Sequence, residues 1–203
     1  MLDGYIRKAI DPTLDRAGEW LANLGVDADT ITLVGLAFGL FSAALIAIGA
    51  GGVIVLLPLL VGRLMDGLDG AVARATAKTD FGGYLDIACD FLFYGAVPLA
   101  FVWRDGDANA AAGAFLLASF YFNATTFLGY AVLAEKYQLE TRARGEKSLY
   151  FTAGLMEGTE TIILFSLVAL FPGLFAPLAW LFGILCFVTA FARIAMAWRV
   201  FQE

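Results

Sequence analysis

Four aspartates lie within two stretches of the sequence that otherwise have the composition of membrane spans: Asp66, Asp69, Asp86 and Asp90. Asp66 and Asp69 are three residues apart, and Asp86 and Asp90 are four apart, so each pair lies on one face of its helix. A short connection makes the two helices antiparallel neighbours, and we expect the two faces to meet. Four carboxylates would repel one another, whereas Mg²⁺ or Mn²⁺ takes oxygen ligands and two such ions can share them.

Small residues and cations accompany the aspartates. Close approach of a ligand would explain the small residues, although a neighbouring helix would use them in the same way. They are Gly67, Gly70, Ala71 and Ala73 in the first stretch, and Gly82 and Gly83 in the second. Arg74 and Lys78 stand at the rim, where a phosphate would need countercharge. Arg63, one turn before Asp66, either pairs with an aspartate or contacts a ligand.

The whole composition predicts an all-α integral membrane protein. Of 203 residues, 61% are hydrophobic and 16% charged, and the mean hydropathy is +0.79. Apolar runs of about twenty residues are long enough to cross a bilayer, and six transmembrane helices can be drawn. Their predicted ranges are 31–49, 53–73, 82–102, 110–134, 149–171 and 175–198. We expect residues 1–30 to form an N-terminal interfacial amphipathic helix and linker, and residues 31–203 a six-helix transmembrane catalytic domain.

The N-terminal segment has apolar residues near helical spacing and lacks the continuous apolar run of a cleavable signal. A helix lying on the membrane surface fits it best, and the alternative is an ordinary soluble cap on the first span. Pro12 is expected to interrupt this helix.

The distribution of lysine and arginine predicts orientation. Eleven cations fall on the side shared by both termini, one lies opposite (Arg104), and Arg63 lies within a span. Both termini should therefore face the cytoplasm, which indicates the cytoplasmic (inner) membrane of a bacterium or archaeon. The eleven are Arg7, Lys8, Arg16, Arg74, Lys78, Lys136, Arg142, Arg144, Lys147, Arg193 and Arg199.

The residue types limit the chemistry. The chain has no histidine, so acid–base catalysis must use carboxylate, lysine, tyrosine or water. Cys89 and Cys186 both fall in predicted spans and suggest no disulfide framework. The acidic groups are local, so the net charge of −6 does not indicate a nucleic-acid partner. Carboxylates within spans also serve ion relays in transporters, which is the main alternative to metal-assisted chemistry.

The runs "DGLDGAVAR" and "GGYLDIACD" resemble the signature of the CDP-alcohol phosphotransferase (CDP-alcohol phosphatidyltransferase) family, D-x2-D-G-x2-A-R-x8-G-x3-D-x3-D. Eight positions match: Asp66, Asp69, Gly70, Ala73, Arg74, Gly82, Asp86 and Asp90. Seven residues instead of eight separate Arg74 from Gly82, which leaves the ligand contacts of that loop open. "DADTITLVGLAFGL" is also similar to the start of the family's first span, without its usual Pro-Asn.

The resemblance implies a phospholipid-biosynthetic transferase that moves a phosphoalcohol group from a CDP-alcohol to an acceptor hydroxyl and releases CMP. Two divalent ions, Mg²⁺ or Mn²⁺, would be held by Asp66, Asp69, Asp86 and Asp90, with Asp90 also the general base. The CDP group would be bordered by Asp69, Gly70, Ala73, Arg74, Lys78 and Gly82. Relatives are commonly homodimers, so a homodimer is possible here.

The acceptor is harder to predict. Arg142, Arg144 and Lys147 would bind a phosphorylated alcohol, or they only mark topology and contact anionic lipid. Glu157 and Glu160 suit hydroxyl recognition, or a salt bridge to these cations.

Our first choice of reaction has CDP-diacylglycerol as donor and a small polar, phosphorylated acceptor, as in phosphatidylglycerophosphate synthases, the members to which the chain looks nearest. The runner-up transfers a CDP-linked aminoalcohol or polyol headgroup to diacylglycerol. Outside enzymes, the alternatives are an ion-coupled transporter and a structural membrane protein with a vestigial site.

Overall fold

The computed structural model describes residues 3–137 and 158–201, and every regular element in this part of the chain is helical. This confirms the all-α prediction for the described residues. The elements are α1 (Asp3–Asn23), α2 (Ala28–Ala47), α3 (Val53–Ala75), α4 (Asp80–Arg104), α5 (Gly106–Lys136), α7 (Gly158–Leu170), the 3-10 turn η2 (Pro172–Leu174) and α8 (Phe175–Val200).

Side-chain caps fix where several helices begin. Asp27 accepts a hydrogen bond from the backbone N–H of Thr30 and caps α2. Thr79 caps α4 through the N–H of Gly82, and Asp105 caps α5 through the N–H of Ala108. Because each cap precedes its apolar run, these helices begin two to four residues before the predicted spans.

The prediction that Pro12 interrupts the first helix is wrong, since α1 continues through it from Asp3 to Asn23. Pro12 lies on the exposed side of α1, where solvent can satisfy the carbonyl that loses its N–H partner. Pro58 and Pro98 likewise lie inside α3 and α4.

Within residues 3–137 and 158–201, four helical segments are long and apolar enough to cross a bilayer: Ala28–Ala47, Asp80–Arg104, Gly106–Lys136 and Pro172–Val200. Many large apolar side chains on them are exposed, among them Phe41 and Trp103, as expected for a protein surrounded by lipid. The chain is therefore an integral membrane protein. The number of six spans stays a prediction, because α3 carries charges in its interior and α7 has only 13 described residues.

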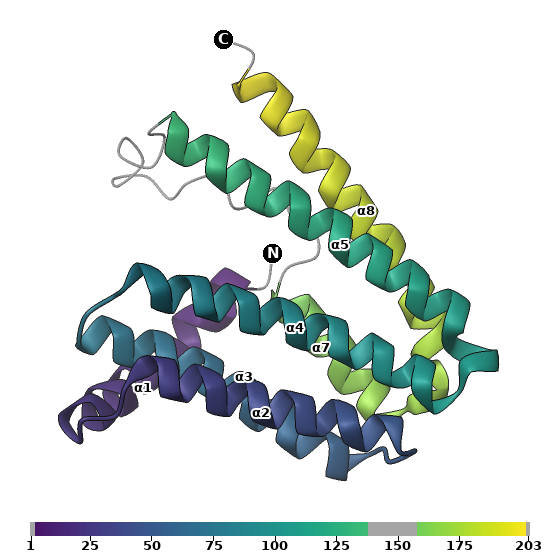
Figure 1. The fold of residues 1–203 in the computed structure, drawn as a ribbon, viewed down its shortest axis with the longest axis horizontal. Coiled ribbons are helices and arrows are strands. Elements are labelled where there is room, and N and C mark those ends of the chain that lie inside the picture. Colours follow the sequence, from purple (N-terminus) through teal and green to yellow (C-terminus); the bar gives the residue numbers. More distant parts are fainter. Residues whose placement is uncertain (1–2, 138–157, 202–203) are drawn as a thin grey trace.

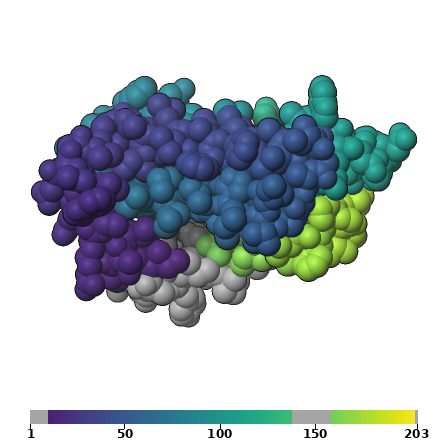
Figure 2. Space-filling view, turned by 90° about the horizontal axis from the view of Figure 1, so that it is seen from below, coloured from purple at the N-terminus to yellow at the C-terminus, as the bar shows by residue number. Residues whose placement is uncertain are grey.

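The helices form two groups (Figure 1). α2, α3 and α4 run alongside one another, with α1 against one end of α3 and α7 against the other. α5 contacts α4 and α8, and the α5–α8 pair diverges from the first group toward Lys136 and Val200. In Figure 2, α1 covers one end of the face formed by α2 and α3. Leu14, Ala17 and Leu21 of α1 pack against buried residues of α2 and α3, and the interfacial position of this helix stays a prediction.

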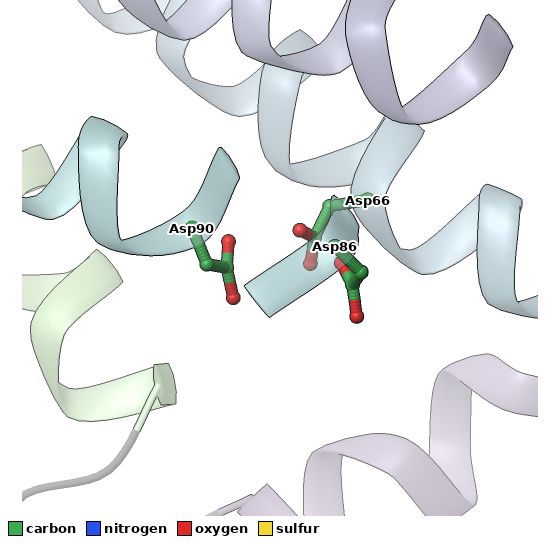
Figure 3. A group of neighbouring side chains, drawn as sticks. All are labelled: Asp66, Asp86 and Asp90. Atoms are coloured by element: carbon green, nitrogen blue, oxygen red, sulfur yellow. The ribbon is translucent and has the colours of Figure 1, made fainter. Parts of the chain in front are cut away.

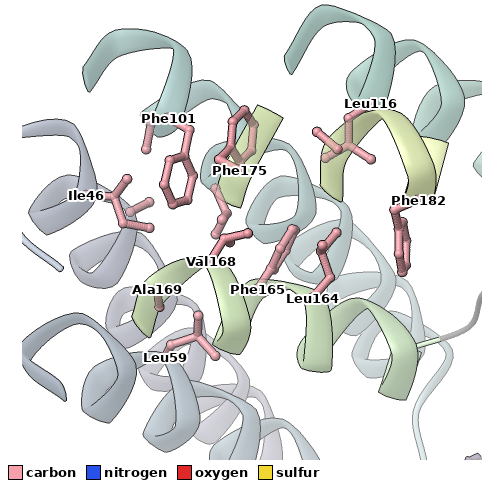
Figure 4. Packing of buried hydrophobic residues seen from close by; sticks show 14 of the residues in the cluster. Ile46, Leu59, Phe101, Leu116, Leu164, Phe165, Val168, Ala169, Phe175 and Phe182 are labelled. Carbon is pink, nitrogen blue, oxygen red and sulfur yellow. The ribbon is translucent and has the colours of Figure 1, made fainter. Parts of the chain in front are cut away.

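The main apolar core lies away from the aspartates. Leu59 of α3 and Phe101 of α4 meet Phe165 of α7 and Phe175 of α8 there (Figure 4). Phe101 and Phe175 stack with ring centroids 4.3 Å apart. This core links the first half of α3 to the second half of α4, and α2, which contacts both helices, holds their remaining halves in place.

Glycines bring α2 and α3 into backbone contact. A Cβ atom at Gly62 of α3 would lie 2.9 Å from the carbonyl oxygen of Gly35 and 3.1 Å from the backbone nitrogen of Gly39. A Cβ atom at Gly39 would in turn lie 2.7 Å from the ring of Phe93. Small residues permit such close helix crossings in membranes. The position of α3, one turn before Asp66, is thus set by contacts that tolerate no side chain.

Candidate functional site

The four aspartates lie near the end of the bundle where α3 joins α4 through residues 76–79. With a rise of 1.5 Å per residue, Asp66 and Asp90 are each about 14–15 Å from that end of their helices, and Asp69 and Asp86 about 9 Å. In the antiparallel arrangement, Asp66 therefore lies at the same level as Asp90, and Asp69 at the same level as Asp86. The faces predicted from the sequence meet as expected.

Three of the carboxylates form a compact group. One oxygen from each of Asp66, Asp86 and Asp90 lies within 4.8 Å of the others, and Figure 3 shows the three groups facing the same space. All three side chains are partly buried. Carboxylate oxygens are the ligands that Mg²⁺ and Mn²⁺ prefer, so this acidic trio (Asp66, Asp86 and Asp90) fits a hard divalent cation.

Asp69 lies outside the acidic trio and is held by a different helix. The hydroxyl of Thr32 in α2 donates a hydrogen bond of 2.6 Å to Oδ2 of Asp69. Asp69 is 5% exposed and Thr32 7%, so the bond is shielded from water and fixes the direction of the carboxylate. Sequence reasoning missed Thr32 as a site residue, although it stands in the run "DADTITLVGLAFGL" that matched the family.

Arg63 contacts the trio. Its Nη1 atom lies 2.6 Å from Oδ1 of Asp90 and 3.3 Å from Oδ1 of Asp66. The guanidinium also lies over the ring of Phe93, 4.3 Å from its centroid, and the side chain is only 8% exposed. Of the two roles left open by the sequence, pairing with aspartate is the one seen in the structure.

The rim residues are placed by α1 and by the helix caps. Nε and Nη2 of Arg74 both donate to Oδ1 of Asp15 in α1, at 3.1 and 2.7 Å, and about half of each side chain is exposed. Lys78 is exposed in the connection between α3 and α4. A Cβ atom at Gly82 would lie 2.9 Å from the hydroxyl oxygen of Thr79 and 3.0 Å from Oδ1 of Asp29, so a side chain there would displace these two oxygens. Asp15 was not predicted, because nothing in the sequence says which face of α1 meets α3.

The small residues near the aspartates divide between packing and open space. A Cβ atom at Gly67 would lie 2.9 Å from Leu14 of α1, and Ala71 is buried against Gly18. At Gly70 the nearest atom is the flexible end of Arg74, and at Gly83 there is none within 4 Å. Ala73 is half-buried. Gly70 and Gly83 are thus the small residues that leave room for a ligand.

Most of the predicted acceptor site lies outside the described residues, namely Arg142, Arg144, Lys147 and Glu157. Glu160 lies in the first turn of α7. It borders a cavity of about 200 Å³ whose remaining lining is apolar and comes from α7 and α8. The structure therefore does not bring Glu160 into the acidic trio.

Arg193 of α8 has a structural role that the sequence did not indicate. Its Nη1 atom donates to the carbonyl oxygen and to Oδ1 of Asn123 in α5, at 3.1 and 2.9 Å, and to the hydroxyl of Thr126 at 2.9 Å. Asn123 and Thr126 therefore join α5 to α8.

Comparison with known proteins places this geometry in a family. Residues 26–201 match the CDP-alcohol phosphatidyltransferase family. Inner membrane protein YnjF of Escherichia coli K12 is 44% identical over 194 residues, which cover 96% of this chain and 94% of that protein. The archaetidylinositol phosphate synthase of Pyrococcus horikoshii is 36% identical over 88 residues, 43% of this chain and 46% of that protein.

A solved structure shares the fold. The Mycobacterium tuberculosis phosphatidylinositol phosphate synthase PgsA1, crystallised with CDP-DAG bound, superposes with a TM-score of 0.66 at 23% identity. The match covers 91% of this chain and 93% of that one. Together with the matched residues, these comparisons show that the chain belongs to the CDP-alcohol phosphatidyltransferase family and is a CDP-alcohol phosphotransferase of the membrane.

Proposed function

We propose that the protein transfers the phosphatidyl group of CDP-diacylglycerol to a small, polar, phosphorylated alcohol and releases CMP. The observation that carries the proposal is the acidic trio, which two neighbouring helices hold within 4.8 Å. A diphosphate brings several negative charges to such a site, and divalent cations are what allows carboxylates and phosphates to share it.

Two divalent ions, Mg²⁺ or Mn²⁺, would be held by Asp66, Asp86 and Asp90 together with Asp69. When bound, such ions stabilise the negative charge on the diphosphate and make CMP a better leaving group. The contribution of the protein is to fix the ligands: α3 and α4 place the trio, and the hydroxyl of Thr32 orients Asp69.

Asp90 is the proposed general base. The acceptor hydroxyl gives its proton to the Asp90 carboxylate as its oxygen attacks the phosphorus of the phosphatidyl group. The new P–O bond forms, the bond from that phosphorus to the oxygen of CMP breaks, and CMP leaves with the bonding electrons. With no histidine in the chain, a carboxylate at this position is the group best suited to accept the proton.

The donor would lie along the rim of the trio. Asp69, Gly70, Ala73, Arg74, Lys78 and Gly82 are the proposed border of the CDP group. The open space at Gly70 and the exposed cations Arg74 and Lys78 support this placement. CDP-DAG bound in the structurally similar M. tuberculosis enzyme supports the choice of donor.

The acceptor would bind toward α7. Arg142, Arg144 and Lys147 are proposed to contact its phosphate, and Glu157 and Glu160 its hydroxyls. The archaetidylinositol phosphate synthase and the phosphatidylinositol phosphate synthase among the similar proteins support a phosphorylated polyol as acceptor.

We also propose that both termini face the cytoplasm and that the site lies near that face. The distribution of cations in the sequence supports this orientation, which lets a water-soluble acceptor meet a lipid donor. Residues 1–30 and 31–203 remain the proposed surface helix with linker and the catalytic domain. A homodimer is the proposed assembly.

The proposal is tested with purified protein in lipid nanodiscs that contain CDP-diacylglycerol and Mg²⁺. Glycerol 3-phosphate, inositol 1-phosphate and unphosphorylated inositol are added separately, and CMP is measured. We expect CMP with a phosphorylated alcohol and none when Mg²⁺ is chelated. CMP formed only from a CDP-linked headgroup and diacylglycerol would overturn the choice of donor, and no CMP under any condition would contradict the proposal as a whole.

A further inference from the structure

Arg63 is the least expected side chain at the site. It is a cation placed where the proposed function requires other cations to bind. It comes from α3, one turn before Asp66, and crosses to Asp90 on α4. With an exposed fraction of 8% and the ring of Phe93 4.3 Å away, the guanidinium has little freedom to turn toward water.

A single nitrogen of Arg63 serves both carboxylates. Nη1 lies 2.6 Å from Oδ1 of Asp90 and 3.3 Å from Oδ1 of Asp66, so one N–H-bearing atom joins the two helices. A carboxylate oxygen that accepts a charge-assisted hydrogen bond is a weaker ligand for a metal ion, because part of its negative charge is already compensated. Arg63 and a divalent ion therefore compete for the carboxylates of Asp66 and Asp90.

The pairing of Arg63 is also incomplete. Its Nε–H is buried and has no hydrogen-bond acceptor among the described residues. A buried donor without an acceptor is unfavourable, so this arrangement does not satisfy the guanidinium fully. A small movement of Asp66 or Asp90 toward a bound ion would leave Arg63 free to adopt a different set of contacts.

We infer that Arg63 is a positioning residue of the proposed metal site: it holds Asp66 and Asp90 together before the ion binds and competes with the ion for them. The inference rests on the proposed function. Removal of the guanidinium leaves two partly buried carboxylates without this cation, so the metal-free protein loses stability and the ion gains affinity.

The test is metal binding in the absence of any substrate. Metal-free protein in detergent is titrated with Mn²⁺, and the free ion is measured by electron paramagnetic resonance. For Arg63→Gln we expect the Kd for Mn²⁺ to fall about tenfold, which corresponds to about 1.4 kcal/mol, and the rise in unfolding temperature on adding Mn²⁺ to exceed that of the wild type.

Two control variants distinguish the effect of the Arg63 charge on metal binding from a general effect of replacing an arginine. Arg63→Lys keeps the charge, so its Kd should stay near that of the wild type. Arg104→Gln removes an arginine at the opposite end of α4, where it donates to the carbonyl oxygen of Ala50, and its Kd should not change. A Kd for Arg63→Gln equal to or weaker than that of the wild type would overturn the inference.

A second measurement uses the wild type in case Arg63→Gln does not fold. In wild-type protein labelled with ¹⁵N-arginine, the Nε–H signal of Arg63 is identified as the one that is absent from Arg63→Lys. We expect this signal to shift when Mg²⁺ is added and the signal of Arg104 to stay unchanged. An unchanged Arg63 signal in protein that binds the ion would overturn the inference. A wild type that binds neither ion would contradict the proposed metal site itself, which is a different result.

Discussion

Gly62→Ala tests whether backbone contact between α2 and α3 positions the acidic trio. The added Cβ atom would lie 2.9 Å from the carbonyl oxygen of Gly35 and 3.1 Å from the nitrogen of Gly39. Both are backbone atoms, which no change of rotamer can remove. Non-bonded heavy atoms prefer separations of about 3.5–4.0 Å, so the two helices must move apart by about 0.5–1 Å.

The expected cost follows from overpacking. Extra methyl groups in a close-packed site destabilise by about 1–3 kcal/mol, and the better helix propensity of alanine returns at most about 1 kcal/mol. In a chain of this size, 1 kcal/mol shifts the unfolding temperature by about 2–4 °C. Taking the net cost as about 1–2 kcal/mol, we expect the unfolding temperature to decrease by about 2–8 °C. Because Asp66 follows one turn later on α3, CMP release should fall by about 10- to 100-fold, as misplacements near 1 Å do.

The assay uses the two cysteines of the chain. Cys89 and Cys186 are 9% and 1% exposed, so a thiol-reactive fluorescent dye reports unfolding in detergent. Gly129→Ala is the matched control, because a Cβ atom at Gly129 in α5 has no neighbour within 4 Å. The control should unfold at the same or a higher temperature and keep full CMP release. If Gly62→Ala behaves like the control, the close α2–α3 contact does not set the geometry of the site.

Three further variants test single residues. Asp90→Asn should lower CMP release by about 10²- to 10⁴-fold, the usual contribution of a general base, with the fold checked by the thiol assay; unchanged turnover would remove Asp90 from this role. Thr32→Val removes the 2.6 Å hydrogen bond to Asp69 and should destabilise the protein by about 1.5–3 kcal/mol, as for bonds to charged groups; Thr32→Ser keeps the donor and should restore the unfolding temperature. Joint replacement of Arg142, Arg144 and Lys147 by glutamine should raise the KM for a phosphorylated acceptor and leave the KM for the donor unchanged; an unchanged acceptor KM would mean that these cations only mark topology.

The sequence predicts those parts of the site that depend on local periodicity. The spacing within each pair, Asp66–Asp69 and Asp86–Asp90, predicts that the two pairs lie on facing helix surfaces. The structure brings one oxygen each of Asp66, Asp86 and Asp90 within 4.8 Å and leaves Asp69 outside this group. The break between the predicted spans 31–49 and 53–73 is also a local feature, and Gly49 and Gly52 beside it have positive φ angles of 92° and 72°. In both cases the controlling interactions lie within a few residues along the chain.

Contacts between distant segments could not be predicted in the same way. Thr32 and Asp69 are 37 residues apart, and the type of neither residue predicts its hydrogen-bond partner. Asp15 meets Arg74 because α1 docks on α3 where Gly18 and Ala71 allow close approach. An amphipathic pattern shows that α1 has an apolar face, but it cannot say whether lipid or protein covers that face.

The carboxylates of Asp66, Asp69 and Asp90 are tolerable in a membrane protein because the fold supplies each of them with a polar partner before any ion binds. An isolated ionised side chain in the bilayer interior is unfavourable by several kcal/mol, and that cost falls when partners are supplied. Arg63 contacts two members of the trio, and Thr32 donates to Asp69. These partners are not equivalent. The neutral hydroxyl of Thr32 orients Asp69 and does not compete with a metal ion, whereas the positively charged Arg63 competes with one. Carboxylates without any polar partner would destabilise the metal-free protein. Carboxylates that were all paired with arginine would not bind metal ions. Among the described residues, Arg63 brings one positive charge to the two carboxylates that it contacts, which leaves the net negative charge that a divalent ion requires.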